Sequence, residues 1–419
     1  MEGDVRRGSG RPWVLVLLVA VASALAYLER QMLPVAKQSI SLELGWDEIQ
    51  YATVIVSGQA AGAIALLLGG GLVDRATIRW APALIIGVSS LAAMVTGAAS
   101  SVGQHVAGRV TMSGVQVLAV PAFFKTIRII LPSSQLTLGI GIASAAGAVG
   151  AIVAPLLVPQ LTAQLGWRAA FMVVGAFGIL LAVAWAMLAP SAAAGAGAGS
   201  APRASAPTLR LYTSPVIWGL AGAKLFSDAT WWLLLFWLPD LFVRDFGLGE
   251  AQIGMPLALI YSLGALGSLA AGLASVQMAK RGLALHQMRL GTMLLCAVGV
   301  TMLPFALLAR EPMTAALVIG LAVAAHQCFA VNLFAIIAEV APPDMVGRYT
   351  ALCVFVGRIG GMVVTMAAAL MLSAHWGYAP MLVAAPLCYL VALALLRWLV
   401  PSRAASGPEG DVDAPALAT

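Results

Sequence analysis

Residues 13–36 read WVLVLLVAVASALAYLERQMLPVA, an apolar run in which Glu29 and Arg30 are the only charges. A helix needs about 20 predominantly apolar residues to cross the hydrocarbon core of a bilayer, and this run is long enough. Arginines precede it, as they precede the apolar core of a signal peptide. Because the run is longer than such a core and carries two charges, it predicts a retained membrane helix.

Similar runs recur along the whole chain. Of its 419 residues 61% are hydrophobic and 10% are charged, whereas a soluble domain carries about 25% charged residues. The chain therefore lacks the polar surface that a soluble protein shows to water, and we expect an all-α membrane protein with twelve transmembrane helices. The expected spans lie near 13–36, 50–70, 82–102, 105–130, 136–161, 169–189, 215–242, 252–277, 290–309, 313–340, 349–373 and 379–400.

The stretch SAAAGAGAGSAPRASAPTLR (191–210) has the composition of a flexible linker and separates the first six spans from the last six. The expected organisation is a cytoplasmic N-terminal segment (1–12), an N-terminal six-helix bundle (13–189), a cytoplasmic linker (190–213), a C-terminal six-helix bundle (214–400) and a disordered tail (401–419).

The basic residues predict the orientation of the chain. With a cytoplasmic N-terminus, fifteen of the 23 basic residues lie on the cytoplasmic side, and only Lys37, Arg168, Arg244 and Arg310 lie outside. Because cytoplasmic loops carry an excess of Lys and Arg, both termini are expected in the cytoplasm of a bacterial cell, with the chain crossing the inner membrane many times.

The remaining basic residues lie inside predicted spans, and two acidic residues accompany them: Arg30, Arg109, Lys224 and Arg358, with Glu29 and Asp228. A charge at the bilayer centre costs about 2.5–3.5 kcal/mol on insertion scales, so such groups usually face a cavity or one another. Four positive charges against two negative ones favour an anionic substrate. Arginine suits a carboxylate, because its planar fork donates two parallel hydrogen bonds.

Some of these charges have a purely structural interpretation. Lys224 and Asp228 lie one helical turn apart and can form an internal pair. Glu29 is the candidate proton site, since burial raises a carboxyl pKa and a nearby cation lowers it. The alternative for Glu29 is a static counter-ion to a charge on another helix.

Several motifs resemble a known family. The segment GGLVDRATIR (70–79) is similar to the loop signature of the major facilitator superfamily, with Gly70, Asp74 and Arg75 in the matching places and Thr77 in place of its usual second glycine. Further blocks resemble the hexuronate branch of the anion:cation symporters: AYLERQ (26–31), GAIVAPLLVPQL with GWRAAF (150–171), KLFSDATWWLLLFWLP (224–239), HQCFAVNLF (326–334) and GRIGGM (357–362).

This resemblance implies two pseudo-symmetric six-helix bundles around a central site that alternates between the two membrane faces. It also implies that Arg30 and Arg109 hold the substrate carboxylate and that Trp237 and Asn332 help line the pocket. Tyr27 lies three residues before Arg30 and can present its hydroxyl beside that guanidinium. Asp74 and Arg75 would latch the cytoplasmic side without touching substrate.

The departures from the branch predict a different substrate. The branch has a G-E-A-x-N-F-P run where this chain has VQVLAVP (115–121), so Gln116 replaces a second coupling carboxylate and Ala119 replaces an asparagine. In span five, Ser144 and Ala148 stand in a pattern that is usually rich in amides. Buried amides satisfy the hydroxyls of a sugar acid, so their loss predicts a carboxylate less hydroxylated than a hexuronate. Arg358 stands where the branch has a small residue, and could meet a second negative group.

The sequence leaves several readings open. We expect proton-coupled uptake of a small organic anion by a monomer, with efflux of a carboxylated metabolite or drug as the alternative and a non-transporting sensor as a remote one. Sodium coupling stays open. No metal-ligand spacing, activated nucleophile or phosphate-binding loop is evident, so we expect neither an enzyme nor a cofactor, and no nucleic-acid partner.

Overall fold

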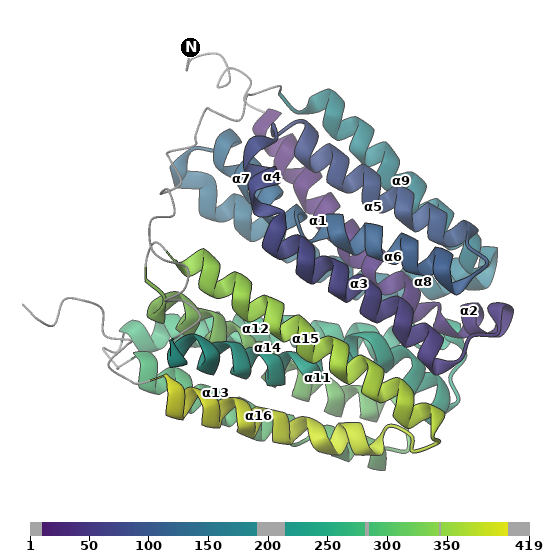
Figure 1. Cartoon of the computed structure of the whole chain (residues 1–419), viewed down its shortest axis with the longest axis vertical. Coiled ribbons are helices and arrows are strands. Elements are labelled where there is room, and N and C mark those ends of the chain that lie inside the picture. The colour runs from purple at the N-terminus through teal and green to yellow at the C-terminus, as the bar shows by residue number, and fades with distance from the viewer. Residues whose placement is uncertain (1–10, 191–213, 281–284, 343–344, 401–419) are drawn as a thin grey trace, which may run out of the picture.

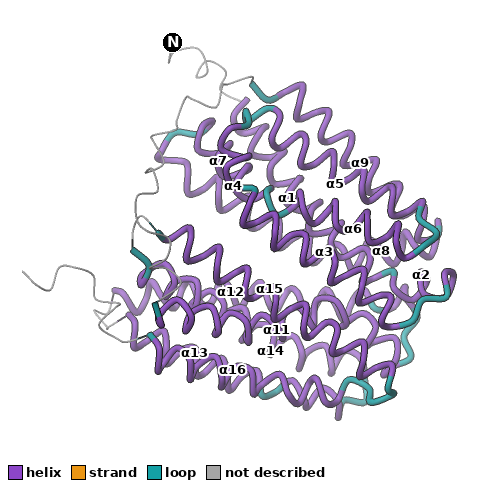
Figure 2. Tube along the Cα trace, viewed as in Figure 1, coloured by secondary structure: helices purple, strands orange, loops and turns teal. Residues whose placement is uncertain are grey.

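The computed structural model describes residues 11–190, 214–280, 285–342 and 345–400. Its elements there are helices joined by short loops, as Figure 2 shows. Most of the predicted N-terminal segment, most of the linker and the whole C-terminal tail lie outside these residues.

The first bundle contains six membrane-crossing units and three short helices, shown in purple to blue in Figure 1. The crossing units are α1 (Arg11–Val35), α3 (Glu48–Leu68), α5 (Trp80–Ala98), the pair α6 (Val102–Gln116) and α7 (Ala119–Ile130), α8 (Leu136–Leu165) and α9 (Trp167–Leu188). The short ones are α2 (Lys37–Leu44), α4 (Gly70–Arg75) and η1 (Ser133–Gln135).

The second bundle repeats this arrangement, in green to yellow in Figure 1. Its units are α11 (Pro215–Phe246), α12 (Gly254–Lys280), α13 (Leu285–Val300) with η3 (Leu303–Leu308), α14 (Pro312–Val340), α15 (Val346–Ser373) and α16 (Ala379–Leu399), with η2 (Glu250–Gln252) before α12.

Eleven helical spans of the described residues are long and apolar enough to cross a membrane. The twelfth is α11, which carries Lys224, Asp228, Asp240, Arg244 and Asp245 and is less apolar than the other eleven, although its length exceeds a bilayer's hydrocarbon thickness. The expected twelve-helix fold is therefore confirmed. Span nine differs in detail, because it ends in the 3₁₀ helix η3.

The two bundles pack their helices in equivalent pairs, which demonstrates their pseudo-symmetry. The pairs α1–α8, α3–α6 and α5–α9 of the first bundle correspond to α11–α15, α12–α14 and α13–α16 of the second. Glycines allow the closest of these contacts: a Cβ at Gly150 would collide with the backbone of Ala24 on α1, and one at Gly360 with the backbone of Leu225 on α11. Such small residues are what lets membrane helices approach closely.

Two lateral contacts, α3 with α15 and α8 with α12, join the bundles and leave α1 and α11 facing each other at the centre. We name the two ends of the molecule after the segments found at each end. The α2 end carries α2, and the linker end is where α9 ends and α11 begins.

Candidate functional site

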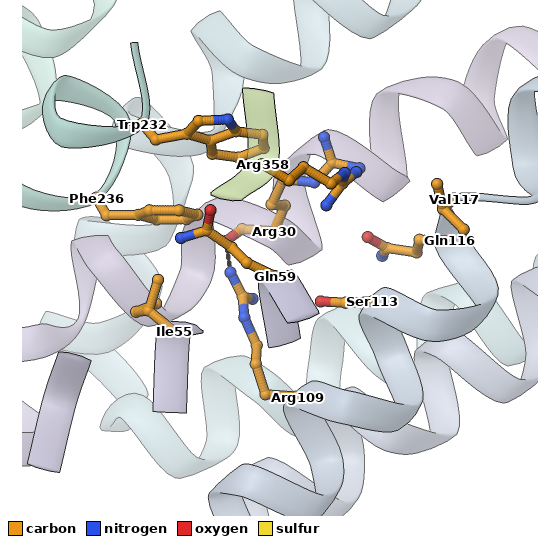
Figure 3. A pocket seen from close by; sticks show the side chains of 10 residues that line it. All are labelled: Arg30, Ile55, Gln59, Arg109, Ser113, Gln116, Val117, Trp232, Phe236 and Arg358. Carbon is orange, nitrogen blue, oxygen red and sulfur yellow. Dashed lines mark hydrogen bonds between the residues drawn. The ribbon is translucent and has the colours of Figure 1, made fainter. Parts of the chain in front are cut away.

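A small polar cavity of about 20 Å³ lies at the centre, where the two bundles meet (Figure 3). Residues from α1, α3, α6, the turn after α6, α11 and α15 line it: Arg30, Ile55, Gln59, Arg109, Ser113, Gln116, Val117, Trp232, Phe236 and Arg358. We call it the arginine cavity. Its volume holds about one water molecule, so a bound substrate needs space beyond it.

Three arginines dominate this lining. Arg109 is buried on α6, and its Nη2 donates to the backbone carbonyl of Arg30 at 3.1 Å (Figure 3). The Arg358 guanidinium carbon lies 5.5 Å from the Trp232 ring centre, and that of Arg109 lies 5.9 Å from the Phe236 ring centre. Such contacts stabilise a cation without neutralising it.

No carboxylate lines the cavity, and none of the three arginines forms an ion pair with a described residue. Arg30 repels both Arg109 and Arg358. Asp228, which pairs with Lys224, also attracts Arg358. Holding three like charges together in a membrane without an ion pair is costly, so the arrangement favours a negatively charged occupant.

A wider cavity of about 330 Å³ adjoins the first one, and Arg30, Gln116, Val117 and Arg358 line both. Its other lining residues come from α1, α7 and α8: Ser23, Ala26, Tyr27, Ala119, Val120, Phe123, Phe124, Ala143, Ser144 and Gly147. The α7 residues lead toward the linker end, because α7 follows α6 in that direction. A space of this size suits a small molecule. Most of its wall is apolar.

A break in span four shapes both cavities. The helix stops after Gln116 and restarts at Ala119. Pro121 explains the break, since it has no N–H to offer the carbonyl four residues earlier and its ring crowds that carbonyl, which belongs to Val117. Gln116 and Val117 therefore stand at an irregular turn at the edge of the cavity.

Glu29 points away from the arginines. Its carboxylate accepts hydrogen bonds from Ser90 Oγ at 2.7 Å and from Gln116 Nε2 at 2.8 Å, and the residue is 2% exposed. It forms no ion pair in the described part of the chain. Among the described residues, Gln116 is thus the one that both donates a hydrogen bond to Glu29 and lines the arginine cavity.

Two residues implied by the resemblance lie elsewhere. Trp237 lines neither cavity; it packs against Tyr51, with ring centres 5.1 Å apart. Asn332 is buried and donates to the carbonyl of Cys328 on its own helix at 2.9 Å. Trp232 and Gln59, which the sequence did not single out, line the arginine cavity instead.

The predicted internal pair and the predicted loop lie outside both cavities. Lys224 Nζ lies 2.7 Å from Asp228 Oδ1, both buried. Arg75 ends α4, while the side chain of Asp74 lies outside the described part of the structure. Lys125 of α7 donates to the carbonyls of Val73 and Ala76 and so ties α4 to the first bundle.

A charge network at the α2 end joins the bundles, and we call it the outer network for its distance from the linker end. Lys37 Nζ contacts Asp240 at 2.6 Å and Glu48 at 2.7 Å. Arg244 pairs with the same two carboxylates, and the Tyr378 hydroxyl donates to Asp240 at 2.5 Å. Burial lowers the pKa of Lys37 to about 8, an effect larger than the opposing attraction of Asp240.

The interbundle hydrogen bonds between described residues all come from one part of the first bundle, residues 37–59. Besides the outer network they join Ser39 to Glu250, Tyr51 to the Phe236 carbonyl at 2.7 Å, and Gln59 to Thr365 at 3.3 Å. The structure is therefore fastened at the α2 end and at the centre.

Two pseudo-symmetric helical bundles, joined by hydrogen bonds at the α2 end and at the centre around a charged cavity, define the class of two-bundle membrane transporters. Residues 19–365 match the profile of the Major Facilitator Superfamily, which is most of the chain. The chain belongs to this superfamily, and it is a transporter and not an enzyme.

Individual proteins with similar sequences and structures support this assignment. The protein of Escherichia coli (strain K12) named "Probable L-galactonate transporter" is 28% identical over 329 residues, 73% of this chain and 71% of that protein. The "Hexuronate transporter" of that strain is 24% identical over 181 residues, 43% of this chain and 42% of that protein. A bacterial homolog of the human lysosomal transporter Spinster, crystallised inward-facing and unoccupied, shares the fold with a TM-score of 0.77 at 18% identity, covering 94% of this chain and 96% of that one.

Proposed function

We propose that this protein is a secondary transporter of a small organic anion, a carboxylate, that binds between the two bundles. The observation that carries the proposal is the set of three arginines in a central cavity without a carboxylate. Two of them come from the first bundle and one from the second, so one anion can contact both bundles and respond to their relative movement. Relatives named as galactonate and hexuronate transporters support an anionic substrate.

The substrate is less hydroxylated than a hexuronate. The wall of the wider cavity includes Ala119, Ala143 and Gly147. Its three hydroxyl groups belong to Ser23, Tyr27 and Ser144. A sugar acid would leave most of its hydroxyls without partners there, and each unpaired polar group in a closed site costs about 1–3 kcal/mol. An acid with an apolar body avoids that cost.

Glu29 carries the coupling proton. It is buried, forms no ion pair with a described residue and accepts hydrogen bonds from two donors. A carboxylate in such surroundings is stabilised by taking up a proton. Gln116 connects it to the arginine cavity, so an arriving anion and a proton on Glu29 can influence each other through one side chain.

The linker end faces the cytoplasm. The described basic residues at that end are Arg11, Arg75, Arg79, Lys125, Arg128, Lys280, Arg289, Arg348 and Arg397, and those at the α2 end are Lys37, Arg168, Arg244 and Arg310. This imbalance agrees with the positive-inside rule. In that orientation the outer network closes the outer face, and the wider cavity leads toward the cytoplasm.

Efflux is the second candidate. The apolar wall formed by Val120, Phe123 and Phe124 on the cytoplasmic side of the arginines would admit a carboxylated metabolite or drug from inside the cell. Proteoliposomes separate the two directions: with an inward proton gradient, uptake predicts accumulation of labelled acid, whereas antiport predicts its expulsion.

The first experiment is thermal stabilisation of the purified protein by a panel of organic acids. The panel runs from glucuronate and galactonate through simple dicarboxylates to aromatic and aliphatic acids. A ligand that binds the folded state at a concentration 100 times its Kd stabilises it by about 2.7 kcal/mol, which raises the Tm. We expect stabilisation by the less hydroxylated acids and its loss in Arg109→Ala. If no anion raises the Tm, the proposal is wrong.

A further inference from the structure

We propose that the substrate carries two anionic groups, and that Arg358 holds the second one; this inference rests on the proposed function of the same cavity. The expected ligand class is a dicarboxylate. One carboxylate lies at Arg30 and Arg109 of the first bundle, and the other lies at Arg358 of the second.

The charge balance is the first argument. Within the described residues, the acids nearest to these arginines are already engaged: Asp228 pairs with Lys224, and Glu29 is held by Ser90 and Gln116. The lining itself adds no negative charge. A monocarboxylate therefore leaves two of three cationic charges uncompensated, whereas a dicarboxylate leaves one.

Unpartnered polar atoms give the second argument. Among the described residues, Arg358 Nε and Trp232 Nε1 are buried donors without an acceptor, and both lie in the arginine cavity. One unpartnered acceptor, Gln59 Oε1, also lines the cavity, so the two donors outnumber it. A buried donor without a partner costs about 1–3 kcal/mol, so these two donors mark a place that an added acceptor would satisfy. They belong to the second bundle, on the far side of the cavity from Arg109 (Figure 3).

The third argument is that residues on two sides restrict the position of the Arg358 guanidinium. Its Nη1 would lie 2.9 Å from a Cβ placed on Gly62, so only glycine at that position leaves the guanidinium where it is. On the other side, the Trp232 ring lies 5.5 Å from the guanidinium carbon. A planar guanidinium held in this way can donate two parallel hydrogen bonds to one carboxylate.

Space for the rest of the ligand adjoins both anion positions. Arg30 and Arg358 line the arginine cavity and also the wider cavity of about 330 Å³. A short carbon chain can thus lie against its apolar wall with one carboxylate at each arginine position. Because the two positions belong to different bundles, the length of that chain matters for how closely the bundles approach.

The test compares matched ligands on the purified full-length protein at fixed pH and salt. Succinate, glutarate and adipate are each paired with the half-amide that has the same shape and one charge less. Kd values come from the dependence of Tm on ligand concentration. In the wild type we expect at least one diacid to bind about tenfold or more tightly than its half-amide, the preference that one additional charge-assisted contact gives.

Three variants assign that preference to Arg358. In Arg358→Gln the diacid and its half-amide should bind within about twofold of each other, while the half-amide keeps its wild-type affinity. In Arg358→Glu the preference should turn toward the ω-amino acid of the same length, such as 5-aminopentanoate in place of glutarate. Arg348→Gln, ten residues earlier on the same helix and outside both cavities, is the matched control and should behave as the wild type.

The outcomes separate this inference from the proposed function. Equal binding of diacid and half-amide by the wild type, or an unchanged preference in Arg358→Gln, overturns the two-anion inference and leaves a monoanion transporter. Absence of stabilisation by any acid overturns both. If Arg358→Gln does not fold, Arg358→Lys serves instead: it keeps the charge and loses the fork, so a reduced diacid preference supports the inference and an unchanged one overturns it.

Discussion

At the scale of single residues, Glu29 and Gln116 form a hydrogen-bonded pair in which Glu29 is the member that can bind and release a proton. Gln116 cannot titrate, but it donates to Glu29 at 2.8 Å and lines the arginine cavity. One titratable group then remains near the cavity on this side. This arrangement predicts that coupling depends on Glu29, while substrate affinity depends on the arginines.

The substitution Glu29→Gln tests this division. The amide preserves the size of the side chain and can still bond with Ser90, but it cannot carry a proton. We expect substrate-induced stabilisation to remain within a few-fold of the wild type. Accumulation driven by a pH gradient, about tenfold per pH unit for one coupled proton, should fall to equilibration. This accumulation is measured in proteoliposomes with a fixed pH difference across the membrane. Accumulation by the variant that equals the wild type would assign the coupling proton to another group.

The residues that line the site differ in how easily they can be identified from the sequence. Arg30, Arg109 and Arg358 stand out because a charge within an apolar run is costly and therefore informative. Trp232 and Trp237 carry no such signal. They lie five positions apart on α11, about 140° around the helix, so one faces the cavity and the other faces Tyr51. The packing of the two bundles decides which of these two faces of α11 lines the cavity. The residue pattern of a single helix carries no information about that packing.

At the scale of elements, charge and proline account for the departures from regular apolar spans. The helix α11 is less apolar than the other spans, in part because it carries Asp240 and Arg244 of the outer network. Its Pro239 removes one backbone donor, and the nearby Phe236 carbonyl accepts from Tyr51 of the other bundle. Sequence patterns predicted the spans. They did not predict which charged residues pair between the bundles, because these residues lie far apart in the sequence.

The outer network predicts a conformational effect of Asp240→Asn. In the structure Asp240 accepts from Lys37, Arg244 and Tyr378, so its neutralisation leaves Lys37 buried with a weaker set of partners. Breaking a buried charge pair costs about 2–5 kcal/mol, and the cost falls on the state in which the network is closed. Spin labels at Leu42 and Trp376, both exposed near the α2 end, should show a longer distance in this variant.

The matched control for this experiment is Glu43→Gln. Glu43 pairs with Arg168 within the first bundle, and both side chains are exposed. Exposed ion pairs contribute about 0–1 kcal/mol, so this variant should keep the wild-type distance. An unchanged distance in Asp240→Asn as well would show that the network does not hold the α2 end closed.

Lys37 makes the stability of the protein depend on pH. Its pKa in the folded protein is lowered to about 8, whereas a lysine in the unfolded chain titrates near 10.4. Between these values the unfolded state binds more protons, so the free energy of unfolding rises with pH by up to about 1.4 kcal/mol per unit. We expect the Tm difference between wild type and Lys37→Met to move in favour of the wild type from pH 8 to pH 10. A difference that does not change with pH would contradict the lowered pKa.

At the scale of the whole molecule, the fastened α2 end and the cavity toward the linker end predict which membrane face has access to the site. Val120 lines the wider cavity and is 57% exposed, whereas Leu42 on α2 is exposed at the other end. In a variant with all four cysteines replaced by alanine, we introduce one cysteine at either position. A membrane-impermeant maleimide should label Val120→Cys in inside-out vesicles and Leu42→Cys in right-side-out vesicles.

The same labels connect the site to the outer network. If the two bundles rock as rigid bodies, opening at the α2 end must narrow the linker end, since α3–α15 and α8–α12 stay in contact between them. Asp240→Asn should therefore slow the labelling of Val120→Cys several-fold while Leu42→Cys reacts as before. Faster labelling of both would mean that the bundles separate without rocking. Labelling of Val120→Cys only in right-side-out vesicles would reverse the proposed orientation, and with it the assignment of the outer network to the outer face.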